Sequence, residues 1–600
     1  MCGIAGLLRF SNRLPDEDLK GRVGRMADRM LHRGPDADGY WADAQGRCHF
    51  GHRRLAILDL SDAGRQPMLD ASRRYAITYN GEIYNFLELR QELERRGRRF
   101  HTRCDTEVLL EGFAEWGEGV FAMLDGQFAL GIYDTETDRL LLARDRVGEK
   151  PLYYRLTKDH LGFASELAAI EAGMPEDLAL SEDGLAQYFM LRYVPAPHTV
   201  YEGVAKLEPG MLMTVDADRR VTVKRYFSFE LDPDESMEAE RFPAFAEQVE
   251  SLLTTSLQRR LNSDVPLGVF LSAGIDSTLS AALLTRRLNV PVKTYTIGFE
   301  GDNQSEHLDA RRFARALDTD HHEYVFSASD FESVGRQVGA WLDEPNGDRS
   351  CVPTYLLSRF TREHVTVAIS GDGGDELFCG YSRYFSFADK IQGKLHEAPL
   401  QALDTYFKHF LPVYGGDAVA STLPKGIAAF RQFIERFIPC FQYPDRSAVH
   451  ALRQLDFLSY MPGAVLPKVD RASMQHSLEV RSPFYDPALL KISQRLATKF
   501  GRNGKTGKLV LRSILGNYVP ADLTALPKRG FGMPPSVFIN NAEAIGKEMA
   551  IARERLEATS FFKDRPTAVG TLARAAGSNI NAAWAFIVLG QWCAARPIRV

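Results

Sequence analysis

The sequence has no long apolar run, no paired-cysteine motif and no excess of positive charge. Its most apolar late run, residues 582–589, is too short to span a bilayer and predicts a buried helix. The seven cysteines form neither a CxxC pair nor a histidine-spaced cluster, which argues against a disulfide framework and a cysteine metal site. The formal net charge of −5 gives no global positive field, so neither nucleic acid nor an anionic membrane is an expected partner.

Two further absences bear on compartment and size. No basic-then-apolar segment opens the chain, and no internal repeat of about 20–50 residues is visible. Because the cysteines are scattered and odd in number, we expect a soluble protein of the reducing cytoplasm. Its 600 residues exceed the roughly 100–200 residues of a typical domain, so more than one domain is expected.

What the chain does contain begins with Met1-Cys2-Gly3-Ile4. Removal of Met1 leaves Cys2 with a thiol and a free α-amine on one residue. The thiol then serves as a nucleophile and the amine as its proton acceptor, since an unperturbed α-amine titrates near ~8. A cysteine in second position is also compatible with no function, so other residues must decide between the two interpretations.

Four polar or small residues of the N-terminal third suit such a nucleophile. Asn80 offers a side-chain N–H and Gly81 a backbone N–H to an oxyanion that develops on a carboxamide. Arg54 suits bidentate binding of an α-carboxylate, and Asp105 suits an α-ammonium. Each has a plain alternative, a hairpin turn after a strand at 75–79 for Asn80-Gly81 and a surface charge for the other two.

Six motifs of the N-terminal third occur in the order that a known family shares. They are MCGI (1–4), HRGPD (32–36), GHRRLAILDL (51–60), YNGEIYN (79–85), CDTE (104–107) and RDRVGEKPLYY (144–154). On these motifs the region resembles class II glutamine amidotransferase domains, whose N-terminal-nucleophile hydrolase fold is an α+β sandwich with layers αββα. The resemblance implies that Cys2 is nucleophile and general base and that glutamine becomes glutamate and ammonia. It implies an oxyanion hole of Asn80 and Gly81 and a glutamine site of Arg54, Leu55, Leu58, Asn80, Gly81, Glu82 and Asp105.

Two short apolar segments of the C-terminal two-thirds each end in a loop of small and acidic residues. The first loop, 272–277, follows a predicted strand at 266–271 and precedes a predicted helix at 278–288. The second loop, 370–376, follows a predicted strand at 365–369. Such loops at the carboxyl ends of parallel strands flank nucleotide clefts, and a helix N-terminus favours phosphate. Neither loop carries a Walker A or dinucleotide motif, so plain packing of strand and helix stays an alternative.

Charged residues in and near these loops predict metal and pyrophosphate binding. Asp276 and Asp375 supply carboxylate oxygens, the ligands that Mg²⁺ prefers beside a pyrophosphate. Lys508 is the best candidate for a cation near departing pyrophosphate, and Lys505 and Lys528 are weaker ones. The plain alternative for each lysine is a surface charge.

Six further motifs carry a second resemblance. They are GVFLSAGIDS (268–277), YTIGFE (295–300), DEPNGDRS (343–350), SGDGGDELFCGY (370–381), KVDRASMQHSLEVRSPFYD (468–486) and KLVLR (508–512). On them the region resembles the synthetase domain of glutamine-hydrolysing asparagine synthetases, an α/β ATP-pyrophosphatase fold with a parallel sheet and a helical C-terminal part. The resemblance places ATP against Leu271, Ser272, Gly274, Asp276, Ser277, Ile297, Ser370 and Gly371. It implies that Asp372 serves acyl-adenylate formation and ammonia capture, that Lys508 is the catalytic lysine, and that Tyr381 lies near the acceptor.

Two positions depart from that family's pattern. Ala273 stands where a second glycine is common, and Cys379 stands where glycine or alanine is usual. A methyl group costs little at negative φ but strains a loop that requires φ > 0. We expect ATP binding to be retained.

Together the two resemblances imply a two-domain enzyme. Residues 2–227 would hydrolyse glutamine, a solvated acidic linker would span 228–241, and residues 242–600 would use ATP and Mg²⁺ to activate a carboxylate as acyl-AMP. Ammonia would reach that intermediate through an internal passage. The leading acceptor is aspartate, with a uronic acid or a biosynthetic intermediate as the open alternative, and a homodimer is possible.

Three other classes fit less well. A β-lactam-forming relative needs no working glutaminase, and a phosphoribosyl-transferring amidotransferase would lack adenylating loops. A non-catalytic scaffold has no reason to combine Cys2 and Asn80 with Asp276 and Asp375.

Overall fold

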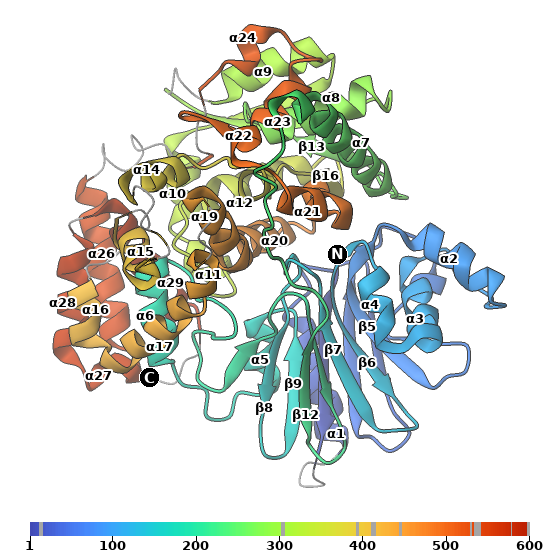
Figure 1. The fold of residues 1–600 in the computed structure, drawn as a ribbon. Helices are drawn as coiled ribbons and strands as arrows, with labels where there is room; N and C mark the ends of the chain where they lie inside the picture. The colour runs from blue at the N-terminus through green and yellow to red at the C-terminus, as the bar shows by residue number, and fades with distance from the viewer. Residues whose placement is uncertain are drawn as a thin grey trace.

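Three main sheets organise the chain. The computed structural model describes residues 1–10, 16–301, 306–391, 395, 397–409, 416–442, 447–527, 531–532, 542–577 and 579–596, so Lys528 lies outside the described residues. Two six-stranded antiparallel sheets belong to the N-terminal part, and one five-stranded parallel sheet belongs to the C-terminal part (Figure 1). Across these ranges, no helix is long and apolar enough to cross a membrane.

The first antiparallel sheet contains the strand that follows Cys2 directly. Its order is β10-β8-β9-β1-β3-β2. The strands are β1 (Gly3–Arg9), β2 (Ala37–Ala42), β3 (Cys48–Arg54), β8 (Tyr153–Leu156), β9 (His160–Ala164) and β10 (Val204–Lys206). Because β1 pairs with β3 on one side and β9 on the other, the start of the chain is fixed inside a sheet.

The second antiparallel sheet, in the order β12-β11-β7-β6-β5-β4, faces the first. Its strands are β4 (Met68–Leu69), β5 (Tyr75–Ile83), β6 (Gly126–Asp134), β7 (Arg139–Arg144), β11 (Met211–Val215) and β12 (Val221–Arg225). Ile4 and Phe50 of one sheet share a buried cluster with Ala129 and Leu142 of the other. Helices α1 (Asp16–Asp28) and α5 (Leu167–Gly173) pack on the first sheet, and α3 (Asp105–Trp116) packs on the second, with α2 (Phe86–Arg95) beside it.

One local prediction in this part is wrong. The strand expected to stop before Asn80-Gly81 continues to Ile83, because both residues pair with β6 instead of turning. Residues 55–58 leave the sheet after β3 and have no strand geometry. Leu55 is nevertheless buried, packed in one cluster with Met1.

The C-terminal sheet has the order β15-β14-β13-β16-β17, and every neighbouring pair is parallel. Its strands are β13 (Leu267–Phe270), β14 (Lys293–Phe299), β15 (Asp320–Phe326), β16 (Val367–Ile369) and β17 (Glu479–Arg481). The two strands that precede the predicted loops, β13 and β16, are direct neighbours. Parallel strands end on one side, so both loops lie at the same edge of the sheet.

Helices surround this sheet and form the rest of the C-terminal part. They include α7 (Phe242–Arg260), α8 (Ile275–Arg286), α9 (Glu306–Leu317), α12 (Cys351–Arg362), α13 (Gly374–Leu377), α14 (Ser382–Ile391), α15 (Pro399–His409), α16 (Gly416–Thr422), α17 (Pro424–Glu435), α19 (Ala448–Leu458), α20 (Leu466–Met474), α21 (Pro487–Gln494), α23 (Leu509–Leu515), α26 (Ala542–Glu557), α28 (Pro566–Ala576) and α29 (Ile580–Ala594). As predicted, the apolar run 582–589 is a buried part of a late helix.

The two parts share hydrophobic cores. Helix α6 (Glu182–Leu191) leaves the antiparallel sheets and packs beside α17 of the C-terminal part (Figure 1). Its Phe189 belongs to one buried cluster with Phe586 and Trp592 of α29. The expectation of a solvated linker is wrong for its apolar members, because Leu231 is buried and Phe229 stacks on Phe457 with ring centroids 3.6 Å apart.

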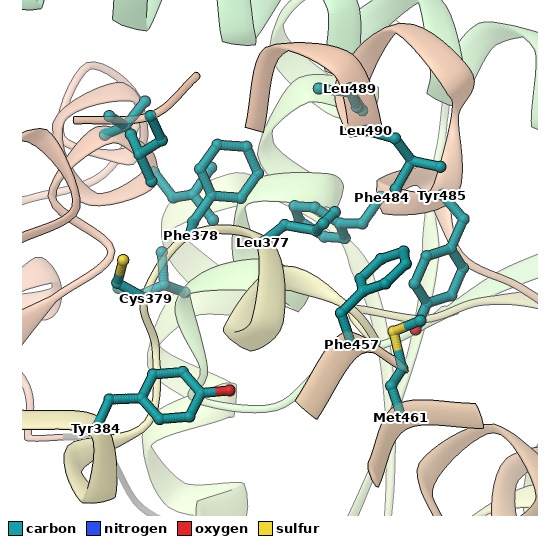
Figure 2. Close-up of a cluster of buried hydrophobic side chains, with 14 of the residues drawn as sticks. Leu377, Phe378, Cys379, Tyr384, Phe457, Met461, Phe484, Tyr485, Leu489 and Leu490 are labelled. Carbon is teal, nitrogen blue, oxygen red and sulfur yellow. The ribbon is translucent and has the colours of Figure 1, made fainter. Parts of the chain in front are cut away.

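The second predicted loop is anchored by apolar side chains that follow it. Leu377 and Phe378 lie in one buried cluster with Phe484 and Leu489 (Figure 2). Cys379 belongs to the same cluster and adopts a left-handed φ of 61°. Full burial of each such large side chain is worth about 1.5–3 kcal/mol, so this anchoring holds the loop firmly at the sheet edge.

Candidate active sites

Cys2 is buried where the antiparallel sheets meet the C-terminal part. Its backbone N–H donates to Asn80 Oδ1 at 2.8 Å, and its Sγ lies 4.0 Å from the Leu55 carbonyl oxygen. Burial raises the pKa of the Cys2 thiol, although the Met1 ammonium opposes the rise. A thiol in this position needs a nearby base to become a nucleophile.

Asn80 and Gly81 lie inside β5, beside Cys2. The Asn80 side chain is fully buried, and its Nδ2 has no hydrogen-bond acceptor among the residues that the structure describes. A Cβ added to Gly81 would lie 2.2 Å from the Gln127 carbonyl oxygen, which explains why this position takes glycine. The strand therefore presents a buried amide donor beside Cys2, a group of the kind that an oxyanion hole requires.

Arg54 lies at the end of β3, near enough for its charge to lower the pKa of the Cys2 thiol. Its guanidinium donates to the carbonyl oxygens of Ser61 at 2.8 Å and Leu58 at 3.3 Å. These contacts hold a mostly buried cation over the segment that follows Leu55. The structure thus brings Arg54 together with Leu58, and Leu55 together with Cys2.

Asp105 and Glu82 supply the acidic groups of the same region. Asp105 Oδ2 accepts hydrogen bonds from the Tyr79 hydroxyl at 2.8 Å and the Ile83 N–H at 2.9 Å. Glu82 Oε2 lies 3.2 Å from Arg481 Nη2. Burial raises the pKa values of both acids, an effect that Arg481 opposes at Glu82.

Arg33 is a buried arginine of this site to which the sequence interpretation gave no role. Its Nε donates to the Cys2 carbonyl oxygen at 3.1 Å, and its two terminal nitrogens bind Asp470 at 2.8 and 3.1 Å. The only available signal was its place in the HRGPD motif, because its partner lies 437 positions away.

Glu479 and Arg481 of β17 were also missed. The Met1 ammonium lies 2.8 Å from Glu479 Oε2, and Arg481 Nε donates to Glu479 Oε1 at 2.6 Å. Burial alone would raise the pKa of Glu479, but the ammonium and Arg481 lower it to about 2. Since Arg481 also contacts Glu82, one ionic chain joins the N-terminal site to the parallel sheet.

The two predicted ATP loops touch each other. A Cβ added to Gly371 would lie 2.9 Å from the Asp276 Cβ, and one on Gly374 would lie 2.4 Å from Asp276 Oδ1. Within the first loop, the hydroxyl oxygens of Ser272 and Ser277 are 2.9 Å apart. The glycines permit a close approach that forms a cradle at the start of α8.

The remaining residues predicted to bind ATP lie at the same sheet edge. Leu271 N–H donates to the Tyr295 carbonyl at 2.9 Å, which sets Leu271 beside β14 and its residue Ile297. Gly274 is the N-cap residue of α8. The Ser370 hydroxyl is buried and lacks a hydrogen-bond partner in the described ranges, as suits a group that awaits a ligand.

Lys508 lies between the two predicted metal ligands. Its Nζ contacts the Asp276 carboxylate and lies 2.7 Å from Asp375 Oδ1. Burial alone would lower the pKa of Lys508, but these two carboxylates raise it above its ordinary value. Oxygens of Asp276 and Asp375 thus converge on one cation, a donor set that fits Mg²⁺. Lys505 is exposed, which matches its weaker candidacy.

Asp372 and Tyr381 flank the cradle. The Asp372 carbonyl accepts the Ser482 hydroxyl at 2.6 Å, and the Tyr381 hydroxyl donates to Glu376 Oε1 at 2.7 Å. Ala273 has a negative φ, so the departure from glycine there brings no left-handed strain.

A small cavity lies between the two parts and is lined by residues of both. Its volume is about 20 Å³, enough for about one water-sized molecule. Met1 and Gln127 line it from the N-terminal part, while Ser370 and Asp372 line it from the parallel sheet. It is called the inner cavity below.

Two known families match different parts of the chain. The glutamine amidotransferase domain family matches residues 1–227, and the asparagine synthase family matches residues 248–576. The protein named asparagine synthetase [glutamine-hydrolyzing] 1 of Bacillus subtilis is 31% identical over 90% of this chain and 88% of its own length. A putative asparagine synthetase [glutamine-hydrolyzing] of Mycobacterium bovis is 33% identical over 86% of this chain and 84% of its own length.

One solved structure shows a weak similarity to this chain. A structure titled as the allosteric regulatory enzyme of purine biosynthesis matches with a TM-score of 0.29 and 18% identity, over 50% of this chain and 67% of its own. A similarity this low supports no conclusion about fold or function.

Proposed function

The chain belongs to the family of glutamine-hydrolysing asparagine synthetases, and from that premise we propose that it makes asparagine from aspartate, glutamine and ATP. Glutamine would be hydrolysed at Cys2, and aspartate would be activated as acyl-AMP at the parallel sheet. The single observation that carries this proposal is the inner cavity, which is lined both by Met1 and by Asp372.

The proposed domains are residues 2–227 for glutamine hydrolysis and 242–600 for synthesis, with 228–241 between them. Alternation of acidic and buried apolar residues in the connecting segment suits a tether that is held against the C-terminal part.

Removal of Met1 would convert the Cys2 backbone N–H into a free α-amine. That nitrogen already donates to Asn80 Oδ1, so the amine would stay beside Sγ as its proton acceptor. The same hydrogen bond orients Asn80 Nδ2, which together with the Gly81 N–H would stabilise the oxyanion. Removal would also clear the space that the Met1 side chain fills between Cys2 and the inner cavity.

The glutamine substrate would be held by its α-groups. Arg54 would bind the α-carboxylate, and Asp105 and Glu82 would bind the α-ammonium, with main-chain contacts from Leu55 and Leu58. A cation and two acids match the two opposite charges that an amino-acid substrate carries. Thioester formation and its hydrolysis then release ammonia and glutamate.

ATP would lie in the cradle formed by the two loops, against Ser272, Ser277 and Ser370. Asp276 and Asp375 would hold Mg²⁺, which when bound neutralises charge on the pyrophosphate. Lys508 would move from these carboxylates to the phosphate groups, where its ammonium stabilises the departing pyrophosphate.

The acceptor carboxylate would lie between the cradle and Tyr381. Its oxygen attacks the α-phosphorus of ATP, giving acyl-AMP and pyrophosphate. Ammonia arriving past Asp372 then attacks the acyl carbon, so that AMP leaves and the amide forms. An internal route protects ammonia from water, where near pH 7 it would be almost wholly protonated and unable to attack.

The test is pyrophosphate release with ATP, ammonium and a panel of carboxylates. Aspartate is expected to give the highest rate. An inert aspartate together with an active uronic acid or other carboxylate would overturn the assignment of the acceptor and keep the reaction type. A panel without any active carboxylate would overturn both.

A further inference from the structure

Asp264 of the C-terminal part is hydrogen-bonded to a loop of the N-terminal part, residues 57–61. Its carboxylate Oδ2 accepts the Asp59 backbone N–H at 2.8 Å, and its own backbone N–H donates to the Ile57 carbonyl oxygen at 2.9 Å. Asp264 lies 205 positions beyond Asp59 in the sequence, in the segment 261–266 that joins α7 to β13. Two hydrogen bonds therefore connect the 57–61 loop to this segment, which is called the α7–β13 connection below.

Asp59 links the 57–61 loop to a second segment of the N-terminal part. Its φ of 52° is left-handed, a conformation that is uncommon for residues other than glycine and persists where the surroundings enforce it. Its Oδ1 accepts the Ser61 hydroxyl at 2.6 Å, and its Oδ2 accepts the Arg103 backbone N–H at 2.9 Å. These hydrogen bonds, that of Arg103 first, lower the pKa of Asp59, so its carboxylate is ionised near pH 7.

The two residues proposed to bind the charged groups of glutamine both adjoin Asp59. Arg54 donates hydrogen bonds to the carbonyl oxygens of Leu58 and Asp59. Asp105 begins α3, two positions after Arg103. A displacement of Asp59 would therefore disturb the supports of both the cation and the acid.

Apolar side chains of the same segments also contact each other. Leu55 and Ile57 are buried in one cluster, against which Val265 of the α7–β13 connection packs. This packing sets how close the two segments lie, whereas the hydrogen bonds of Asp264 orient the 57–61 loop. Because Asp264 is exposed, its substitution removes a hydrogen bond without opening a cavity in a hydrophobic core.

We propose that Asp264 is a positioning residue of the glutamine site, which keeps Arg54 and Asp105 at the spacing that the two charged α-groups of glutamine require. This inference rests on the proposed function, because it assumes that these two residues bind glutamine. It assigns to the C-terminal part a direct share in the affinity for glutamine.

The physical reason is the freedom of the 57–61 loop. The hydrogen bond from Asp264 restricts the loop before glutamine arrives, so that binding does not have to order it. Without that bond, part of the binding free energy of glutamine would be spent on ordering the loop and Arg54. Cys2 and Asn80 are held by β1 and β5, so the reaction of bound glutamine should be unaffected.

The test compares Asp264→Ala and Asp264→Asn with the unaltered enzyme in steady-state release of glutamate from glutamine. Asp264→Ala should raise the KM for glutamine at least about fivefold, the effect of about one hydrogen bond, and leave kcat within about twofold. Asp264→Asn keeps a side-chain oxygen that accepts the Asp59 N–H, so its KM should stay within about twofold of the unaltered value.

Glu182→Ala is the matched control. Glu182 of α6 also uses its carboxylate to accept a backbone N–H across the two parts, that of Lys425 at 2.9 Å. Since Glu182 has no hydrogen bond to the 57–61 loop among those of the described residues, its substitution should leave the KM for glutamine within about twofold. Asp264→Ala should likewise keep synthesis from ammonium within about twofold, because the ATP cradle does not depend on the loop.

Three outcomes would overturn the inference. They are an unchanged KM in Asp264→Ala, an equal rise of KM in Asp264→Asn or in Glu182→Ala, and a loss of ammonium-dependent synthesis in Asp264→Ala. An unaltered protein that releases no glutamate from glutamine would instead overturn the proposed function.

Discussion

The Cys2 site and the ATP cradle differ in how ready they are for their substrates. At Cys2 the polar groups are already oriented, with Asn80 Oδ1 occupied by the Cys2 N–H and Nδ2 left for a ligand. In the cradle, Lys508 neutralises Asp276 and Asp375, so the charges that would bind Mg²⁺ and pyrophosphate satisfy each other. The first site is preorganised, whereas the second must exchange ion pairs when it is loaded.

The backbone shows the same contrast. Cys2, Asn80 and Gly81 lie at the start of or within sheet strands, where ordinary extended geometry suffices. Around the cradle, Cys379 has a φ of 61° and Lys508 a φ of 55°, both left-handed. Such conformations cost about 1–2 kcal/mol each in L-residues and persist where packing enforces them. Independent substitutions in each site test how separate the two are.

Replacing Cys2 should have the largest effect and should be confined to one site. Cys2→Ala is expected to lower glutamine-dependent synthesis by about 10⁴-fold or more, because no other group can form the thioester. Synthesis from ammonium should stay within about twofold of the unaltered rate. The measurement is glutamate release and asparagine formation with each nitrogen source. Loss of synthesis from ammonium as well as from glutamine would contradict separate sites.

The converse substitution is Asp276→Ala. It removes one predicted metal ligand and one ionic partner of Lys508, so pyrophosphate and AMP formation should fall on the order of 10³-fold. Glutamine hydrolysis in the absence of ATP should be unchanged. A pyrophosphate assay and a glutaminase assay on the same variant measure the two activities. An equal loss of both activities would mean that the sites are not separable.

Asn80→Ala probes preorganisation at the first site. Loss of one oxyanion donor should lower kcat for glutamine hydrolysis by about 10²–10³-fold, or about 2.7–4 kcal/mol, with a much smaller change in KM. Steady-state kinetics of glutamate release measure both constants. A change in KM alone would show that Asn80 binds the substrate without stabilising the oxyanion.

The smallest effect is expected for Cys379 beside the cradle. Cys379→Gly loses the buried thiol but relieves the left-handed φ, whereas Cys379→Ala loses the thiol and keeps the strain. The free energy of unfolding, measured with denaturant, should therefore be about 1 kcal/mol higher for Cys379→Gly than for Cys379→Ala. Equal stabilities would show that the backbone strain at this position is negligible.

Most of the fold that supports these sites follows from local sequence patterns. The apolar strand at 266–271 and the small residues after it predicted β13 and a loop before α8, although the helix begins three residues earlier than expected. The end of the strand was predicted too early at Asn80-Gly81, because this pair resembles a hairpin turn. Its partner strand β6 lies more than forty positions away in the sequence. The burial of Phe229 could not be predicted from local sequence either, because its stacking partner, Phe457, lies far away in the sequence.

The ionic contacts between the two parts could not be predicted. Arg33 and Asp470, like Met1 and Glu479, are joined only by the packing of the antiparallel sheets against β17 and α20. A charged residue carries no local sign of which distant charge it will meet. Motif residues such as Cys2, Asp276 and Lys508 could be proposed from the sequence because the proposed chemistry of each demands its residue type.

The central claim is that ammonia moves inside the protein from Cys2 to the activated acceptor. The direct measurement supplies glutamine labelled with ¹⁵N in its amide group, together with an excess of unlabelled ammonium, ATP and aspartate, and determines the label in the new amide. An internal passage predicts product that is enriched in ¹⁵N far above the ratio in solution. Product labelled only at the solution ratio would mean that ammonia escapes to solvent, and the account would be contradicted.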